Sequence, residues 1–224
     1  MRDMWAPWEV APALALLAML VFALTAASVL SLLAHRLPRG LDALLAEQTS
    51  RAHRRYRIGF WLACPVLAGL CAWYFGPTPA AVAGFIYMAV LLALAWIDAE
   101  TGLLPDMLSL PLLWLGLLVN LHGTFTPLQD AVLGAVAGYL MLWGVCRLFW
   151  LFTGRTGMGH GDFKLLAAMG AWVGWAFLPW IVLASSSFAL AVGLTLRWTG
   201  RLKAGDPLYF GPYLAGAGIL ALLL

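Results

Sequence analysis

The chain has 224 residues, of which 63% are hydrophobic and only 10% are charged, and it carries a net charge of +3 at pH 7. Soluble globular domains contain about 25% charged residues, so this composition excludes that class of protein. The small positive charge is weak support for nucleic-acid binding, and we expect no nucleic-acid partner. Long apolar runs favour helices over the alternating pattern of barrel strands. We therefore predict an all-α, polytopic transmembrane helical bundle in a lipid bilayer.

Apolar runs typical of membrane spans follow one another along the whole chain. We predict eight spans, at about residues 10–34, 58–75, 80–97, 107–121, 130–152, 164–177, 180–196 and 208–224. Pro179 is the only helix breaker that we recognise between the sixth and seventh runs, so the division is placed there. Small residues in the fifth and sixth runs, such as Gly134, Gly138 and Gly170, allow close helix approach. We treat residues 1–224 as a single integral membrane domain.

The basic residues test this count, because cytoplasmic loops collect Lys and Arg. With the N-terminus outside, four loops share one side of the membrane, namely 35–57, 98–106, 153–163 and 197–207. All thirteen Lys and Arg residues except Arg2 lie in these loops or at the adjoining ends of the helices. This side is therefore assigned to the cytoplasm, and the same assignment puts Asp98 and Asp162 at the cytoplasmic boundary.

Two aspartates are the candidate catalytic residues. Asp98 ends the apolar run 85–97, and Asp162 lies in the glycine-rich stretch 157–166. An ionisable group at a membrane boundary is costly unless it is paired or faces a wet cavity, which indicates a function. Two acids shielded from water share one proton, and such a pair can activate water and polarise a peptide carbonyl. The alternative is that both are loop acids satisfied by water or by Lys164 and Arg155.

Other acids lie close to these two in sequence. Glu100 and Asp106 are rivals of Asp98 for the position of the first acid. Asp106 follows a proline, which suits the N-cap of the fourth helix, and we prefer that interpretation. Asp130 and Asp206 are likewise interpreted as helix caps.

The residues around Asp162 suggest further roles. Gly157, Gly159 and Gly161 are expected to adopt positive φ and to let the backbone approach a bound peptide closely. Lys164 is predicted either to hold a substrate carboxylate or to orient the loop, and its alternative role is to mark the cytoplasmic end of its helix. His160 has no second His or Cys at ligand spacing, so we expect no metal there.

These stretches resemble the type IV prepilin leader peptidases, a family of membrane aspartyl proteases marked by Gly-x-Gly-Asp. Residues 159–162 match that tetrad, and residues 157–170 follow the family pattern nearly throughout. Residues 96–106 resemble the family's first-aspartate segment, and residues 209–213 resemble its "FGP" segment. The resemblance implies a peptidase core at 80–224 with Asp98 and Asp162 as the catalytic pair. It also implies that Gly159, Gly161 and Lys164 position the substrate or the loop.

The function implied by this resemblance is that of an endopeptidase of the bacterial inner membrane, with its active site at the cytoplasmic face. Its substrates would be type IV prepilins or the pseudopilins of type II secretion, whose leader peptides it would cleave without a cofactor. No oligomeric state is predicted.

Many members of the family also methylate the new N-terminus with S-adenosylmethionine, and the sequence departs from those members in the first cytoplasmic loop. Residues 35–57 lack the two C-x-x-C pairs that look zinc-binding in such members, so we expect no zinc. Ser31 stands where the family pattern has Asn. Methyltransfer remains open, and no residue is assigned to it or to S-adenosylmethionine.

A proton- or cation-coupled transporter is the alternative function, because paired acids at membrane depth can relay ions. Transporters tend to contain repeated halves with interrupted helices near the midplane. We find no such repeat, and both acids lie at one boundary, so a peptidase is the preferred hypothesis.

Overall fold

The computed structural model describes residues 12–41, 50–154, 159–201 and 209–224. Over these residues the chain forms eight α-helices and no strand. The helices are α1 (Pro12–Leu41), α2 (Ser50–Phe75), α3 (Pro79–Thr101), α4 (Asp106–Val119), α5 (Leu128–Thr153), α6 (His160–Val173), α7 (Leu178–Trp198) and α8 (Gly211–Leu222). Two short 3-10 helices, η3 (Asn120–His122) and η4 (Trp175–Phe177), follow α4 and α6. The prediction of an all-α bundle built from eight helical segments is confirmed.

The helices differ in length and therefore in how they relate to a bilayer. Five helical stretches are long and apolar enough to cross a membrane: Leu16–Leu37, Arg57–Phe75, Pro79–Thr101, Leu128–Thr153 and Trp175–Trp198. Asp106–His122 and Gly211–Leu222 are shorter apolar helices. The protein is thus a multi-pass membrane protein. With 14 residues, α6 is about 21 Å long, less than the ~30 Å of a hydrocarbon core.

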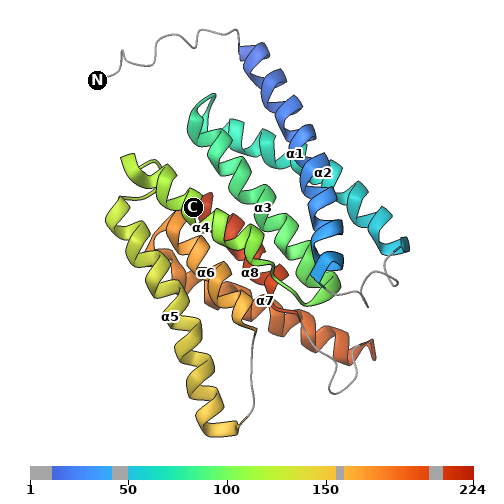
Figure 1. Ribbon diagram of the computed structural model, residues 1–224, viewed down its shortest axis with the longest axis vertical. Coiled ribbons are helices and arrows are strands. Elements are labelled where there is room, and N and C mark those ends of the chain that lie inside the picture. The colour runs from blue at the N-terminus through green and yellow to red at the C-terminus, as the bar shows by residue number, and fades with distance from the viewer. Residues whose placement is uncertain (1–11, 42–49, 155–158, 202–208) are drawn as a thin grey trace.

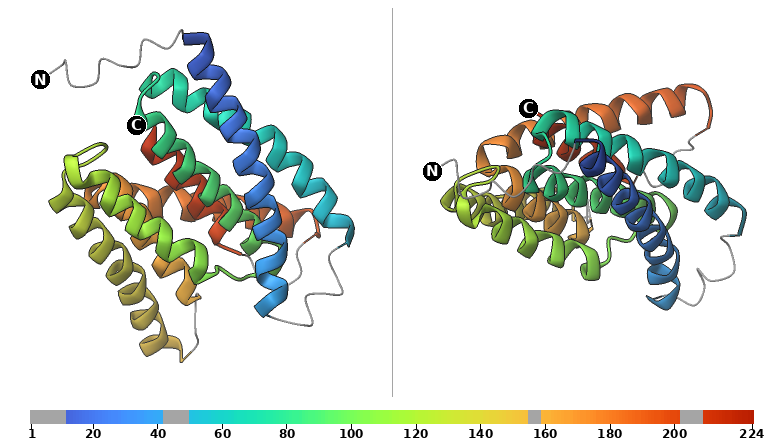
Figure 2. Two further views of the ribbon diagram at one scale, coloured as in Figure 1. Left: turned by 45° about the horizontal axis from the view of Figure 1, so that its top comes forward. Right: turned by 90° about the horizontal axis from the view of Figure 1, so that it is seen from above.

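Two of the short helices, α6 and α8, lie in the middle of the bundle (Figure 1). Helices α1 and α2 pack on each other and on α3 at one flank, while α5 lies at the opposite flank against α6. Figure 2 shows α8 running beside α3, and α7 also packs on α8. Helices α1, α2, α5 and α7 turn many large apolar side chains outward, as helices that face lipid do. Within α6, every residue from Asp162 to Val173 except Lys164 is buried.

Glycines bring α5 and α6 into backbone contact. A Cβ atom on Gly138 would lie 2.6 Å from the carbonyl oxygen of Leu166. Gly134 and Gly170 face each other so closely that a Cβ on either would overlap the carbonyl of the other. This is the close approach that the small residues of these two segments predicted, and it holds α6 firmly against α5.

The far end of α6 is tied down by buried hydrogen bonds. Asn120 is fully buried, and its Nδ2 donates to the carbonyls of Ala171 at 2.9 Å and Trp172 at 3.0 Å. Its Oδ1 accepts from the backbone N–H of Phe125 at 2.9 Å. The indole Nε1 of Trp172 donates to the carbonyl of Leu112 at 2.8 Å. These bonds fix the C-terminal end of α6 to α4 and η3.

The boundary between α6 and α7 does not lie at Pro179 as predicted. Helix α6 ends at Val173, and Gly174 follows with a φ of +84°, a conformation that L side chains rarely adopt. Pro179 instead lies in the first turn of α7, where its missing N–H costs no helical hydrogen bond. The sequence interpretation gave weight to proline and overlooked glycine as the residue that ends the helix.

Candidate active site

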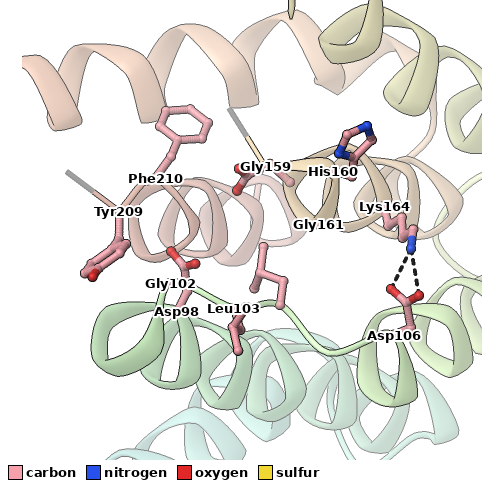
Figure 3. A pocket seen from close by; sticks show the side chains of 12 residues that line it. Asp98, Gly102, Leu103, Asp106, Gly159, His160, Gly161, Lys164, Tyr209 and Phe210 are labelled. Atoms are coloured by element: carbon pink, nitrogen blue, oxygen red, sulfur yellow. Dashed lines mark hydrogen bonds and ion pairs between the residues drawn. The ribbon is translucent and has the colours of Figure 1, made fainter. Parts of the chain in front are cut away.

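A cavity of about 530 Å³ lies where three connections meet at one end of the bundle. It is lined by Asp98, Gly102, Leu103, Leu104, Asp106, Gly159, His160, Gly161, Asp162, Lys164, Tyr209 and Phe210. Figure 3 shows that these residues come from the end of α3, the start of α4, the start of α6 and the segment before α8. All five residues predicted for the site line this cavity: Asp98, Asp162, Gly159, Gly161 and Lys164.

Asp98 lies in the last turn of α3 and is only 5% exposed. The helix ends at Gly102, which adopts a φ of +67° and donates its N–H to the carbonyl of Asp98 at 2.8 Å. The side-chain Oδ2 of Asp98 accepts a hydrogen bond from the backbone N–H of Gly211 at 2.9 Å. The carboxylate is therefore held in place by a residue far away in the sequence.

Asp162 lies in the first turn of α6 and is 7% exposed. Gly159 is the N-cap of this helix, so no side chain caps it. The dipole of α6 favours a negative charge at this position. Among the described residues, however, the Oδ1 atom of Asp162 is buried without a hydrogen-bond partner. Burying this oxygen without a partner favours the protonated form of the carboxyl group.

The two acids influence each other electrostatically. Asp162 lies outside the five helical stretches long enough to span a membrane. Its pKa is raised to about 7, first by burial and then by the charge of Asp98, while a backbone hydrogen bond from Gly159 acts in the opposite direction. Like charges at short range cannot both ionise readily, so the pair retains one proton over much of the acidic range.

The glycines around Asp162 act for a different reason from the one predicted. Neither Gly159 nor Gly161 has a positive φ, and Gly159 has a φ of −74°. Gly161 is required because a Cβ at this position would lie 2.7 Å from the Cβ of Leu104. A Cβ on Gly159 would meet nothing closer than Oδ2 of Asp162 at 3.8 Å. Gly157 lies outside the described residues.

Lys164 forms an ion pair with Asp106, and both oxygens of that carboxylate accept from Nζ at 2.7 Å. The pair links the start of α4 to α6 and is drawn with dashed lines in Figure 3. The alternative interpretation of Asp98 and Asp162 as loop acids required Lys164 to pair with one of them. Lys164 pairs with Asp106 instead. Asp106 is the first residue of α4 and the N-cap is Pro105, so the prediction that Asp106 is the cap was wrong.

The remaining acids are separate from the cavity or lie outside the described residues. Glu100 is part of α3 but does not line the cavity. Asp130 lies in the first turn of α5, where Pro127 is the N-cap, and it accepts a hydrogen bond from Nε1 of Trp175 at 3.2 Å. Asp206 and Arg155 fall in segments that are not described. Asp98 and Asp162 are therefore the two buried carboxyl groups that the cavity brings together.

His160 opens α6 at the edge of the cavity, with its ring 5.5 Å from that of Phe163. Over the described ranges no three His, Cys, Asp or Glu residues are grouped as metal ligands. The cysteines do not resemble a zinc site, because Cys64 and Cys71 are buried in α2 whereas Cys146 belongs to α5. These donors do not fit the zinc sites of the family members described above.

Three residues before and at the start of α8 were not assigned a role from the sequence. Tyr209 and Phe210 line the cavity, and Gly211 contacts Asp98. The ring of Tyr209 packs so closely on Gly102 that a Cβ there would lie 2.6 Å from the ring. In the sequence, these residues could be noticed only through the resemblance of residues 209–213 to the "FGP" segment. That resemblance does not indicate which residues they contact.

The matched part of the chain contains both cavity aspartates. Residues 85–194 match the family described as the Type IV leader peptidase family. The chain belongs to this family. The match extends from α3 into α7, and the resemblance noted in the sequence is thereby confirmed.

Several relatives of this family are similar over most of the chain. A protein named "Prepilin leader peptidase/N-methyltransferase" from Burkholderia pseudomallei is 53% identical over 161 residues, which is 72% of this chain and 52% of the relative. Proteins of the same name from Stutzerimonas stutzeri and Pseudomonas aeruginosa are 51% and 52% identical, over 72% of this chain and 56% of each relative. The match thus spans about half the length of these curated relatives. No solved structure matches the chain.

Proposed function

We propose that this leader peptidase family member is a membrane aspartic endopeptidase that removes the leader peptide from type IV prepilins or type II secretion pseudopilins. The observation that carries the proposal is the pair of buried aspartates in one cavity, each at the end of a different helix. The printed names of the relatives support the substrate class. The peptidase core is proposed to comprise residues 80–224, since the cavity is built from α3, α4, α6 and the start of α8.

The proposed reaction uses a pair that holds one proton. The ionised carboxylate takes a proton from water while the water oxygen bonds to the scissile carbonyl carbon. The other carboxyl group gives its proton to the carbonyl oxygen, so that a neutral tetrahedral diol forms. When the C–N bond breaks, the leaving nitrogen receives the proton taken from water, and a diol hydroxyl returns its proton to the second acid. The pair ends in its starting state.

The proposed location is the bacterial inner membrane, with the cavity at the cytoplasmic face. The distribution of basic residues supports it, because the loops 153–163 and 197–207, which lead to cavity residues, contain Arg155, Arg197, Arg201 and Lys203, and in the predicted topology they share one side of the membrane with the loop 98–106. A transporter is less well supported, since Asp98 and Asp162 share one cavity at one end of the bundle rather than a path across it.

Methylation of the new N-terminus with S-adenosylmethionine is a second activity supported by the relatives' printed names. The cofactor would supply the methyl group. No residue of the cavity is assigned to the binding of S-adenosylmethionine.

The direct test is to incubate the purified protein in liposomes with a pilin-like precursor and to measure the released leader by mass spectrometry. Labelled S-adenosylmethionine in the same reaction reports methylation separately. We expect leader release at a single peptide bond. A properly inserted protein that leaves several prepilins and pseudopilins intact would contradict the proposal.

A further inference from the structure

Gly211, the first residue of α8, lies directly against the side chain of Asp98. Its N–H donates to Oδ2 at 2.9 Å. A Cβ at Gly211 would lie 2.6 Å from Oδ2, 2.8 Å from Cγ and 3.0 Å from Cβ of Asp98. Figure 3 shows Asp98 pointing from α3 toward the segment that carries Tyr209 and Phe210. The carboxylate is thus packed on the Cα atom of a residue that must lack a side chain.

Helix α8 is fastened to α3 on both sides of this contact. The hydroxyl of Tyr87, about three turns before Asp98 in α3, donates to the carbonyl of Gly218 at 3.1 Å. The ring of Tyr209 packs on Gly102 just beyond the end of α3. Because both contacts link the same two segments, the N–H of Gly211 has little freedom to move away from Asp98.

Each acid accepts a backbone hydrogen bond, Asp98 from Gly211 and Asp162 from Gly159, but the surroundings of the two carboxyl groups differ. A hydrogen bond from a backbone N–H stabilises the charged form of a carboxyl group, and Asp98 accepts such a bond at good geometry. Helix dipoles do not separate the two acids, because the start of α8 favours a negative charge at Asp98 and the start of α6 favours one at Asp162. Asp162 has one buried oxygen without a partner among the described residues. A buried oxygen without a partner favours the protonated form of the Asp162 carboxyl group.

The other titratable groups around the cavity do not reverse this difference. Lys164 and Asp106 neutralise each other in their ion pair. His160 lies on α6, the helix of Asp162, and Tyr209 contacts Gly102 at the end of α3. The charged group that couples directly to Asp162 is Asp98 itself.

We propose that Gly211 is a positioning residue of the catalytic pair: its N–H holds Asp98 ionised and aligned, so that Asp98 takes the proton from water and Asp162 gives its proton to the carbonyl oxygen. This inference rests on the proposed peptidase function and assigns the two roles that the reaction above leaves open. Asp98 passes the proton that it took from water to the leaving nitrogen. Asp162 regains a proton from a hydroxyl of the diol, so both acids return to their starting states.

The first test compares Gly211→Ala with Gly216→Ala in the same helix, where a Cβ would meet nothing within 4 Å. The added methyl of Gly211→Ala displaces the carboxylate, and a displacement of ~1 Å costs about 100-fold in rate. We expect kcat to fall by about that factor with KM little changed. The acidic limb of the pH–rate profile should move to higher pH, because the charged form of Asp98 loses its donor. Gly216→Ala should match the wild type.

An unchanged rate and pH profile in Gly211→Ala, or an equal loss in Gly216→Ala, would overturn the proposal. A second measurement covers the case in which Gly211→Ala does not fold. It records the infrared band of protonated carboxyl groups at mildly acidic pH in the wild type, Asp98→Asn, Asp162→Asn and the control Asp106→Asn. We expect part of the band to disappear in Asp162→Asn alone.

Loss of that band in Asp98→Asn, or its full retention in Asp162→Asn, would assign the proton to Asp98 and overturn the inference. The infrared measurement needs no substrate. If the wild type cleaves no pilin-like precursor, the proposed function fails while the assignment of the proton is still decided. The two failures are therefore distinguishable.

Discussion

At the scale of single residues, the structure separates the two aspartates from the other acids of the chain. Asp98 and Asp162 are buried and share the cavity, whereas Asp106 is neutralised by Lys164 and Asp130 lies at the start of α5. Burial alone does not establish catalysis, but a pair of buried acids facing one cavity is an arrangement that needs a chemical reason. Two predictions follow from the titration of this pair.

Asp98→Asn and Asp162→Asn should each reduce leader cleavage by at least 100-fold without unfolding the protein, because an amide preserves the shape but cannot transfer the proton. The measurement is the rate of leader release. Size-exclusion chromatography and circular dichroism check that each variant is folded. Asp130→Asn is the matched control, since Asp130 does not line the cavity. Full activity in Asp98→Asn would move the first acid to Glu100 or Asp106.

Cleavage should depend on pH through Asp162, whose pKa is raised to about 7. As the pH rises through this value the pair loses its shared proton, and the rate of leader release should fall. The same proton is bound more tightly by the folded than by the unfolded state, so its stabilising effect is full at low pH and is lost as the pH rises through about 7. Asp162→Asn should therefore be more resistant to thermal unfolding than the wild type above pH 7. A flat profile for both rate and stability between pH 5 and 9 would argue against a raised pKa.

At the scale of elements, the short helix α6 positions the chemistry because it is held on several sides. Glycines bring it against α5, Asn120 fixes its end, and Lys164 links its start to α4. These supports explain how a 14-residue helix keeps a buried acid in place. They also predict which substitutions on α6 disturb the site.

Gly161→Val should inactivate the peptidase although it removes no titrating group. The new side chain would collide with Leu104, whose Cβ lies 2.7 Å from the position of an added Cβ, and would push the start of α6 away from the α3–α4 connection. We expect a loss of at least 100-fold in kcat, measured on folded protein. The control is Gly144→Val in α5, where a Cβ meets nothing within 4 Å. Equal activity in the two variants would show that the contact with Leu104 is adaptable.

The ion pair between Lys164 and Asp106 should matter for activity more than for stability. Its side chains are 30% and 52% exposed, and exposed ion pairs contribute about 0.2–1 kcal/mol. We expect Lys164→Met and Asp106→Asn to lower kcat by a similar factor while the melting temperature changes little. The double variant should be no worse than either single one, because both remove the same link. A loss confined to Lys164→Met, with a raised KM, would instead indicate that Lys164 binds a substrate carboxylate.

At the scale of the whole molecule, the cavity lies where three connections between helices come together at one end of the bundle. The α3–α4 connection, the start of α6 and the segment before α8 all contribute to it. Helices of alternating direction bring these connections to one end of the bundle, so the orientation in the membrane decides from which side a substrate enters.

Tags inserted in the loops at 35–57 and 197–207 should report the cytoplasm, and a tag at 122–129 should report the opposite side, because the basic residues gather in the first two loops. The measurement is reporter fusion or cysteine accessibility in intact cells. Opposite locations for the tags at 35–57 and 197–207 would overturn the eight-helix topology in the membrane.

The sequence alone determined the helical segments, the family and the two candidate acids. Apolar runs, charge placement and the Gly-x-Gly-Asp tetrad are local features of the sequence. They can be recognised without knowing how the helices pack. Only the tertiary structure decided that Gly161 is needed for contact with Leu104, that Lys164 pairs with Asp106, and that Gly174 ends α6. The bond between Gly211 and Asp98 joins residues 113 positions apart. Such contacts depend on which helices become neighbours, and that is decided by the packing of the whole chain rather than by the pattern within any one segment.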